Sequence, residues 1–73
     1  MSDYAINMFW SGEDQAWVAD IPDLKHCSAH GATAEEAVRE VTVAKQLWIE
    51  SAREAGRAIP RPRYRPAIYQ LAR

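Results

Sequence analysis

Hydrophobic and polar residues alternate with a period of two along the first part of the chain. The alternation runs over residues 4–10 and again over residues 16–21, and a polar stretch at residues 11–15 separates the two segments. A period of two places successive side chains on opposite faces of a strand, so both segments are predicted to be strands. A connection of about five turn residues is typical of a β-hairpin. Pro22 cannot donate to a ladder and should close the second strand.

The pattern becomes helical after a third short segment. Residues 26–30 are predicted to form a third antiparallel strand, which Gly31 ends. Thr33 and Glu36 fit a capping box, in which the Thr33 hydroxyl accepts the N–H of Glu36 and the Glu36 carboxylate reaches back to Thr33. Apolar residues then recur at steps of three and four, which predicts a helix over residues 34–55. Gly56 is placed to end that helix in the left-handed conformation.

Prolines dominate the segment that follows the helix. Pro60 and Pro62 make the chain extended and stiff, and Pro66 forbids a helix just before it. Residues 67–72 carry enough β-forming residues to predict a final strand. The expected fold is therefore α+β with the order β-β-β-α-β, in which an antiparallel three-stranded meander carries one helix on one sheet face. We expect residues 1–73 to form a single domain.

One amphipathic helix covers only one face of a sheet. The first two predicted strands have apolar residues on both faces, so another molecule is needed to cover the second face. A chain of 73 residues buries only about 60% of its unfolded surface, and association is a common source of further stability. We therefore expect a homodimer or a tetramer.

Charge is distributed unevenly along the chain. Residues 1–56 hold ten acidic and four basic residues, a net charge of −6, whereas residues 57–73 hold five arginines and no acid, a net charge of +5. One interpretation is that this basic tail folds back on the acidic body, and another is that it contacts nucleic acid. Nucleic-acid binding is the less favoured interpretation, because the tail has no lysine and no known binding motif. The five arginines are Arg57, Arg61, Arg63, Arg65 and Arg73.

Cys27 is the single cysteine, which rules out an internal disulfide and fits a reducing cytoplasm. The N-terminus lacks the basic and apolar regions of a signal peptide, and no apolar stretch approaches the roughly 18 residues of a membrane span. We expect a cytoplasmic protein that does not enter a membrane.

Two clusters of side chains are possible metal sites. His26, Cys27 and His30 lie close in sequence, but in a strand the two histidines share one face and the cysteine faces the other, so the three would not converge. A carboxylate cluster that binds magnesium is the second possibility, and the simpler interpretation is solvated loop acids and a helix cap. We expect no catalysis, no metal and no cofactor. The carboxylates concerned are Asp14, Asp20, Asp23 and Glu36.

Candidate partner-binding residues lie on the predicted hairpin and the loop after it. Trp10 stands beside the hairpin turn, where an exposed tryptophan can anchor an interface, whereas Trp17 and Trp48 are expected in the core. Four acids are expected to gather at the turn and the following loop, either as ordinary solvated residues or as a face that steers a basic partner. They are Glu13, Asp14, Asp20 and Asp23.

Four motifs in order and spacing resemble the HicB-like antitoxin domain. They are Trp-Val-Ala-Asp-Ile-Pro-Asp-Leu at 17–24, Cys-Ser-Ala-His-Gly-Ala-Thr at 27–33, Glu-Glu-Ala at 35–37, and Gly-Arg-Ala-Ile-Pro-Arg-Pro at 56–62. The similarity covers residues 4–62. Where the family has Leu-Pro-Gly-Cys, this chain has Leu24-Lys25-His26-Cys27, which alters the loop.

The resemblance implies a partial, degenerate ribonuclease-H-like fold without ribonuclease activity. It also implies the antitoxin role in a type II toxin–antitoxin pair, whose toxin is a small basic messenger-RNA interferase that the antitoxin domain binds and blocks. Full-length members usually carry a C-terminal ribbon-helix-helix or helix-turn-helix domain, for which this chain is too short. A stand-alone oligomeric structural or regulatory protein without a toxin is the alternative function.

Overall fold

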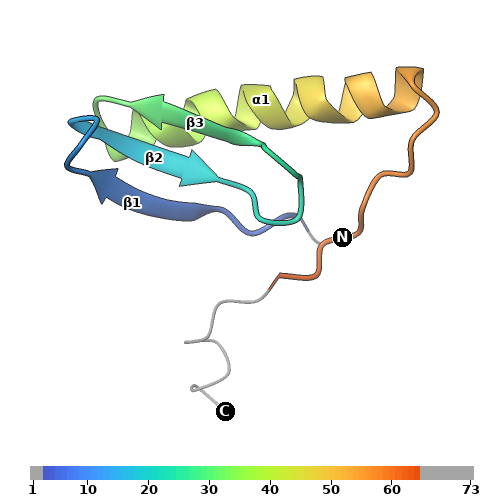
Figure 1. Ribbon diagram of the computed structural model, residues 1–73, viewed down its shortest axis with the longest axis horizontal. Helices are drawn as coiled ribbons and strands as arrows, with labels where there is room; N and C mark the ends of the chain where they lie inside the picture. The colour runs from blue at the N-terminus through green and yellow to red at the C-terminus, as the bar shows by residue number, and fades with distance from the viewer. Residues whose placement is uncertain (1–2, 65–73) are drawn as a thin grey trace, which may run out of the picture.

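A computed structural model describes residues 3–64 of the chain as one layer of β-sheet with a helix packed on one face (Figure 1). The elements are β1 (Asn7–Ser11), β2 (Ala16–Asp20), β3 (Ser28–Gly31) and α1 (Ala34–Glu54). The sheet is a fully antiparallel meander with the order β1-β2-β3. The α+β prediction is confirmed. The final strand predicted at 67–72 lies outside the described residues, and the ribonuclease-H-like relation stays a prediction.

The hairpin predicted from the alternation is confirmed. Met8 pairs with Ala19 and Trp10 pairs with Trp17 across β1 and β2. Since directly paired residues point to the same side of a sheet, these four side chains share one face. Met8, Trp17 and Ala19 belong to or pack against the core under α1, so this is the helix-facing side. β2 ends at Asp20, two residues before Pro22, as expected from the missing proline N–H.

α1 begins at the predicted cap. The Thr33 hydroxyl accepts the N–H of Glu36 at 3.1 Å. The Glu36 carboxylate accepts the N–H of Ala32 at 2.7 Å, one residue before the N–H that the capping-box pattern predicts. Glu35 and Glu36 lie in the first turn, where the helix dipole favours negative charge.

α1 ends in a Schellman motif. Gly56 has a φ of 71°, its N–H donates to the carbonyl of Arg53 at 3.1 Å, and the N–H of Arg57 donates to the carbonyl of Ala52 at 2.8 Å. Gly56 therefore adopts the left-handed conformation predicted for it, and the prediction of a helix over 34–55 was one residue too long.

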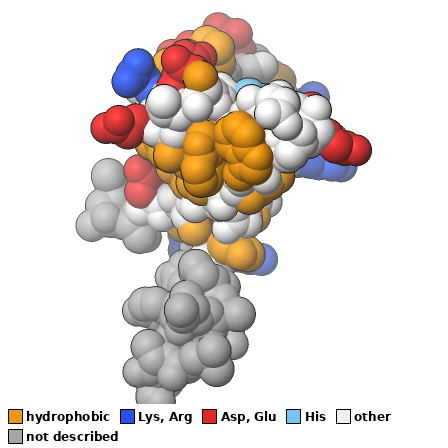
Figure 2. All heavy atoms as spheres, turned by 90° about the vertical axis from the view of Figure 1, so that its left-hand side faces the viewer, with side chains coloured by type: hydrophobic (Ala, Val, Ile, Leu, Met, Phe, Trp, Pro, Cys, Tyr) orange, Lys and Arg blue, Asp and Glu red, His pale blue; other side chains and the backbone are white. Residues whose placement is uncertain are grey.

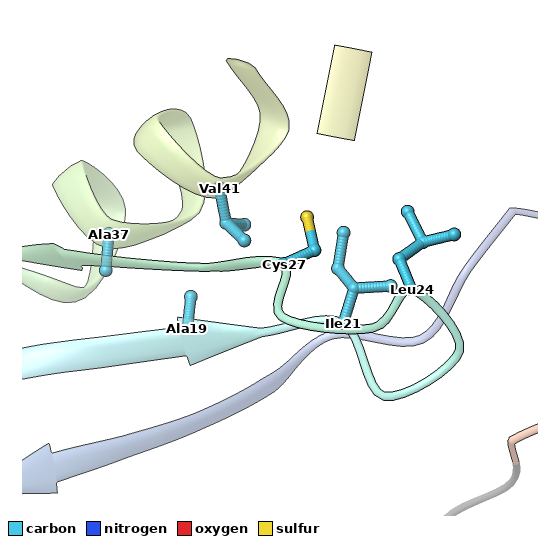
Figure 3. Packing of buried hydrophobic residues seen from close by; sticks show 6 residues of the cluster. All are labelled: Ala19, Ile21, Leu24, Cys27, Ala37 and Val41. Atoms are coloured by element: carbon cyan, nitrogen blue, oxygen red, sulfur yellow. The ribbon is translucent and has the colours of Figure 1, made fainter. Parts of the chain in front are cut away.

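The core lies between α1 and the helix-facing side of the sheet. Ala37 and Val41 point down from α1, toward buried side chains that rise from β2 and from the loop after it (Figure 3). Trp17 and Trp48 pack against this cluster as half-buried residues, in keeping with the core position expected for them. The buried cluster consists of Ala19, Ile21, Leu24, Cys27, Ala37 and Val41.

The predicted third antiparallel strand is confirmed, but its predicted start at His26 was wrong. β3 begins at Ser28, and the segment before it forms two consecutive β-turns, closed by hydrogen bonds of 3.0 Å from the N–H of Leu24 to the carbonyl of Ile21 and from the N–H of Cys27 to the carbonyl of Leu24. Ile21, Leu24 and Cys27 are all buried, so every third residue of this loop anchors it to the core. His26 has a φ of 64° and cannot belong to a strand.

Candidate partner-binding site

The turn between β1 and β2 is held by its own polar side chains. The Ser11 hydroxyl donates to the Asp14 carboxylate at 3.0 Å and accepts the N–H of Asp14 at 3.2 Å. The side-chain amide of Gln15 donates to the carbonyl of Gly12 at 2.7 Å. The Asp14 carboxylate also lies 3.6 Å from Nε2 of His30 on β3. Asp14 is therefore a turn-forming residue as well as an exposed acid.

Trp10 lies beside this turn and is 49% exposed. Its ring packs edge-to-face on the ring of Trp17, with centroids 5.9 Å apart and an interplanar angle of 71°. An edge-to-face contact is favourable for two aromatic rings, so it helps to hold the Trp10 side chain in one orientation. The structure thus presents a half-exposed indole that packs on Trp17, and the interface role of Trp10 stays a prediction.

The helix start comes to the same end of the molecule as the hairpin turn (Figure 1). Trp17 pairs with Gly31, and Gly31 lies against the first turn of α1, which carries Glu35 and Glu36. Viewed from this end, hydrophobic side chains gather in the middle, with acidic side chains around them (Figure 2). We name this surface the hairpin end and define it by Trp10, Glu13, Asp14, Glu35 and Glu36.

The sequence pattern does not assign Glu35 and Glu36 to a partner-binding surface, because it places both at the helix start and indicates Glu36 only as a capping residue or a magnesium ligand. The sequence does contain a clue to this position. In an antiparallel meander the third strand ends on the same side as the first hairpin turn, and the short connection after it keeps the helix start on that side.

The other two predicted acids lie elsewhere. Asp20 ends β2 at the far end from the hairpin turn, and Asp23 lies in the loop after it. The four acids therefore form two groups rather than one. Asp20 lines an open hollow of about 540 Å³ on the sheet face opposite α1, together with Phe9, Val18 and the loop residues Lys25 and His26.

The Asp23 carboxylate holds the segment that follows the helix. One of its oxygens accepts the N–H groups of Arg63 at 2.8 Å and of Tyr64 at 3.0 Å. The Tyr4 hydroxyl donates to the carbonyl of Pro60, so the same segment is tied to the chain before β1. Residues 57–64, which we call the strap, therefore fold back on the body.

The strap carries three of the five predicted arginines, and the other two lie outside the described residues. Arg61 and Arg63 line an open hollow of about 510 Å³ with Pro22, Asp23 and Pro60. The fold-back interpretation is thus supported for residues 57–64, through backbone groups of the strap and a carboxylate of the body. Arg57, Arg61 and Arg63 lie in the strap, and Arg65 and Arg73 follow it.

Within residues 3–64, no three His, Cys, Asp or Glu side chains converge as a metal site would require. His26 lies in a turn rather than in the predicted strand, so the argument that it shares a face with His30 does not apply. Cys27 is buried, and burial raises the pKa of its thiol, with a smaller lowering by Lys45 and a smaller raising by Asp20. Cys27 acts as a small core residue, in agreement with its place in the hydrophobic cluster.

No helix among the described residues has both the length and the apolar character to cross a bilayer.

Comparison with known proteins adds an independent observation. The family described as the HicB_like antitoxin of bacterial toxin-antitoxin systems matches residues 4–70. A UPF0150 protein from Synechocystis sp. is 41% identical over 44 residues, which cover 60% of this chain and 60% of that protein. The alignment thus spans less than two thirds of the relative's length. No solved structure matches the chain significantly.

Proposed function

Because the chain belongs to the HicB-like antitoxin family of bacterial toxin–antitoxin systems, we propose that it is an antitoxin that binds a small messenger-RNA interferase and occludes the active site of that toxin. The family match over residues 4–70 carries this proposal. The role is regulatory and non-enzymatic, because occlusion needs a complementary surface and no catalysis or cofactor.

The hairpin end is the surface that best fits this role. Trp10 offers an aromatic anchor that Trp17 already holds in position, and tryptophan is enriched among the residues that dominate binding energy. Exposed carboxylates around such an anchor attract a basic partner and accelerate its association, particularly at low salt. Trp10, Glu13 and Asp14 are therefore the proposed toxin contacts, and Glu35 and Glu36 extend the acidic rim.

Asp20 and Asp23 are weaker candidates for direct contact. Asp20 faces the hollow on the other side of the sheet, and the Asp23 carboxylate already binds two N–H groups of the strap. Charge reversal at either residue would also disturb the loop or the strap, so these positions do not isolate an electrostatic effect on binding.

The test requires a candidate toxin, namely any small basic ribonuclease that a neighbouring gene encodes, which is purified and titrated with the full chain. RNA cleavage should stop at a fixed stoichiometry. Glu13→Lys should slow association several-fold, because it reverses a charge on the rim. Glu50→Lys makes the same charge change on α1, away from the hairpin end, and should change association little.

Two results would contradict parts of the proposal. Complete RNA cleavage at excess antitoxin would contradict the antitoxin role and leave the stand-alone oligomer as the remaining function. Equal effects of the two charge reversals would contradict the hairpin end as the contact surface, while the antitoxin role would stand. RNA binding by the chain alone that weakens steeply with salt would indicate the arginine-rich tail as a nucleic-acid site.

A further inference from the structure

The strap is held on the body through its backbone. The Asp23 carboxylate accepts the N–H groups of Arg63 and Tyr64. The Tyr4 hydroxyl donates to the carbonyl of Pro60. Because backbone groups of the strap make these contacts, the arginine side chains that it carries are not needed to hold it. The tail can therefore fold back on the body and still offer its arginines to a partner.

The three arginines of the strap are exposed and carry unneutralised charge. Within residues 3–64, no ion pair or side-chain hydrogen bond involves the guanidinium groups of Arg57, Arg61 and Arg63. The strap itself contains no acidic residue. It lies beyond the C-terminal end of α1 and away from the hairpin turn, so its positive charge is separated from the acidic hairpin end (Figure 1).

Two of these arginines border the same hollow. Arg61 and Arg63 line the open hollow of about 510 Å³ together with Pro22, Asp23 and Pro60. A proline precedes each arginine and favours an extended backbone, in which residues two apart are separated by about 6 Å. This separation is comparable with that of neighbouring phosphates along a nucleic-acid strand. A planar guanidinium binds a phosphate through paired hydrogen bonds.

We propose that Arg61 and Arg63 bind neighbouring phosphate groups of a single-stranded nucleic acid that lies along the strap. The strap forms no helix or strand that could enter the groove of a duplex, whereas a flexible single strand can follow an extended, positively charged segment. The Asp23 carboxylate in the same hollow is already engaged by two N–H groups.

The lining of the hollow favours a nucleic acid over an acidic peptide. Protein partners gain most of their binding energy by burying large side chains in well-packed pockets. The described lining contains two prolines, two arginines and an aspartate, and no large hydrophobic residue. A peptide would therefore find charge at this hollow but little apolar surface, whereas phosphate groups need only the charge and the hydrogen-bond donors of the arginines.

Fluorescence anisotropy of a labelled oligouridylate, titrated with the full chain, tests the proposal. The assay contains no toxin, so its result is independent of the proposed antitoxin role. Binding should weaken as salt rises from about 50 to 200 mM, because each phosphate contact releases counterions. An oligothymidylate of the same length should bind equally well, because the contacts are to phosphates alone.

Removal of both charges tests the two arginines directly. Arg61→Gln combined with Arg63→Gln should weaken binding about tenfold at low salt. The slope of log K against log salt should become shallower by about 1.4, which is about 0.7 for each lost contact. Circular dichroism checks that the variant folds, which is expected because both side chains are exposed.

The matched control combines Arg39→Gln with Arg53→Gln, which removes two exposed arginines from α1 and gives the same net charge. It should bind nearly as tightly as wild type, since salt screens distant charges. Equal losses in the two double variants, or salt-independent binding or none by wild type, would overturn the strap as the site. Tighter binding of a DNA duplex or of poly-glutamate would overturn the assignment to a single-stranded nucleic acid.

Discussion

The indole N–H of Trp48 donates to the carbonyl oxygen of Lys25 at 2.9 Å and ties the second half of α1 to the loop between β2 and β3. The other contacts that hold this loop are its own backbone hydrogen bonds and the burial of its anchoring residues. Because Lys25 is the second residue of the turn Leu24–Cys27, the hydrogen bond fixes the orientation of the peptide group that precedes His26. The exposed Lys25 and His26 side chains therefore lie on a turn whose backbone is hydrogen-bonded to Trp48 of α1.

We expect His26 to destabilise the folded protein through its backbone conformation. A φ of 64° at the third turn position is strained for a residue with a side chain and suits glycine. We expect His26→Gly to raise the free energy of unfolding by about 0.5–1 kcal/mol, as measured by urea denaturation. Lys25→Gly makes the same kind of change beside it, where φ is not positive, and should lower the free energy of unfolding by a similar amount. Destabilisation by both variants would contradict this account of the turn.

Gly31 is required by the close approach of β3 to α1. A Cβ atom at Gly31 would lie 2.5 Å from the backbone nitrogen of Ala37 and 2.9 Å from the carbonyl carbon of Glu36. We expect Gly31→Ala to lower the free energy of unfolding by about 2–3 kcal/mol, because backbone atoms cannot move aside cheaply. Gly12→Ala is the matched control, since a Cβ there meets no atom within 4 Å, and it should change stability by less than about 0.5 kcal/mol.

Much of the fold could be predicted from local patterns. The period-two segments around Met8 and Val18 gave the hairpin, and the positions of Thr33 and Gly56 gave both ends of the helix to within a residue. In each case neighbouring residues alone determine the structure, through alternation or through a cap. The final strand at 67–72 remains untested by the described residues.

The loop after β2 was harder to predict because its turn residues are unusual. A glycine at position 26 would have signalled a turn with a positive φ, whereas histidine there looks like part of an alternating strand. The burial of Leu24 and Cys27 against α1 and the hydrogen bond from Trp48 to Lys25 help to fix the two turns, and these contacts join distant parts of the sequence.

The candidate site was only partly predictable for a related reason. Asp14 and Asp20 are close in sequence, but β2 separates them by most of its length, at about 3.3 Å per residue. Glu35 is far from Asp14 in sequence, yet the pairing of Trp17 with Gly31 brings the helix start to the hairpin side. Proximity in sequence therefore suggested one group that contains Asp14 and Asp20, whereas the strand pairing places Asp14 at the same end of the molecule as Glu35.

Cys27 should make stability fall at alkaline pH. Burial raises the pKa of its thiol above the ordinary value of 9.0, so the folded protein keeps the thiol protonated where the unfolded chain loses the proton. The contribution of this group is complete below about pH 9 and is lost as the pH rises toward the folded-state pKa. We expect the difference in unfolding free energy between wild type and Cys27→Ala to shrink between pH 7 and pH 10, in urea denaturation at each pH. A constant difference would contradict this linkage.

Asp23 should control whether the strap stays on the body. Its carboxylate accepts two N–H groups, from Arg63 and Tyr64, and charge-assisted hydrogen bonds of this kind are stronger than neutral ones. Asp23→Ala should therefore increase hydrogen exchange at the Arg63 and Tyr64 amides by about tenfold, which corresponds to about 1.4 kcal/mol of lost protection. The core amide of Val41 should exchange at nearly the wild-type rate, because it belongs to the helix rather than to the strap.

The matched control for this change is Glu50→Ala, which removes an exposed carboxylate from α1 without touching the strap. It should leave exchange at Arg63 and Tyr64 unchanged. Unaltered exchange at both amides in Asp23→Ala would show that the Tyr4 hydrogen bond to Pro60 suffices to hold the strap. Faster exchange at Val41 as well would show that the strap and the core unfold as one unit, since local opening of the strap alone leaves the helix amides protected.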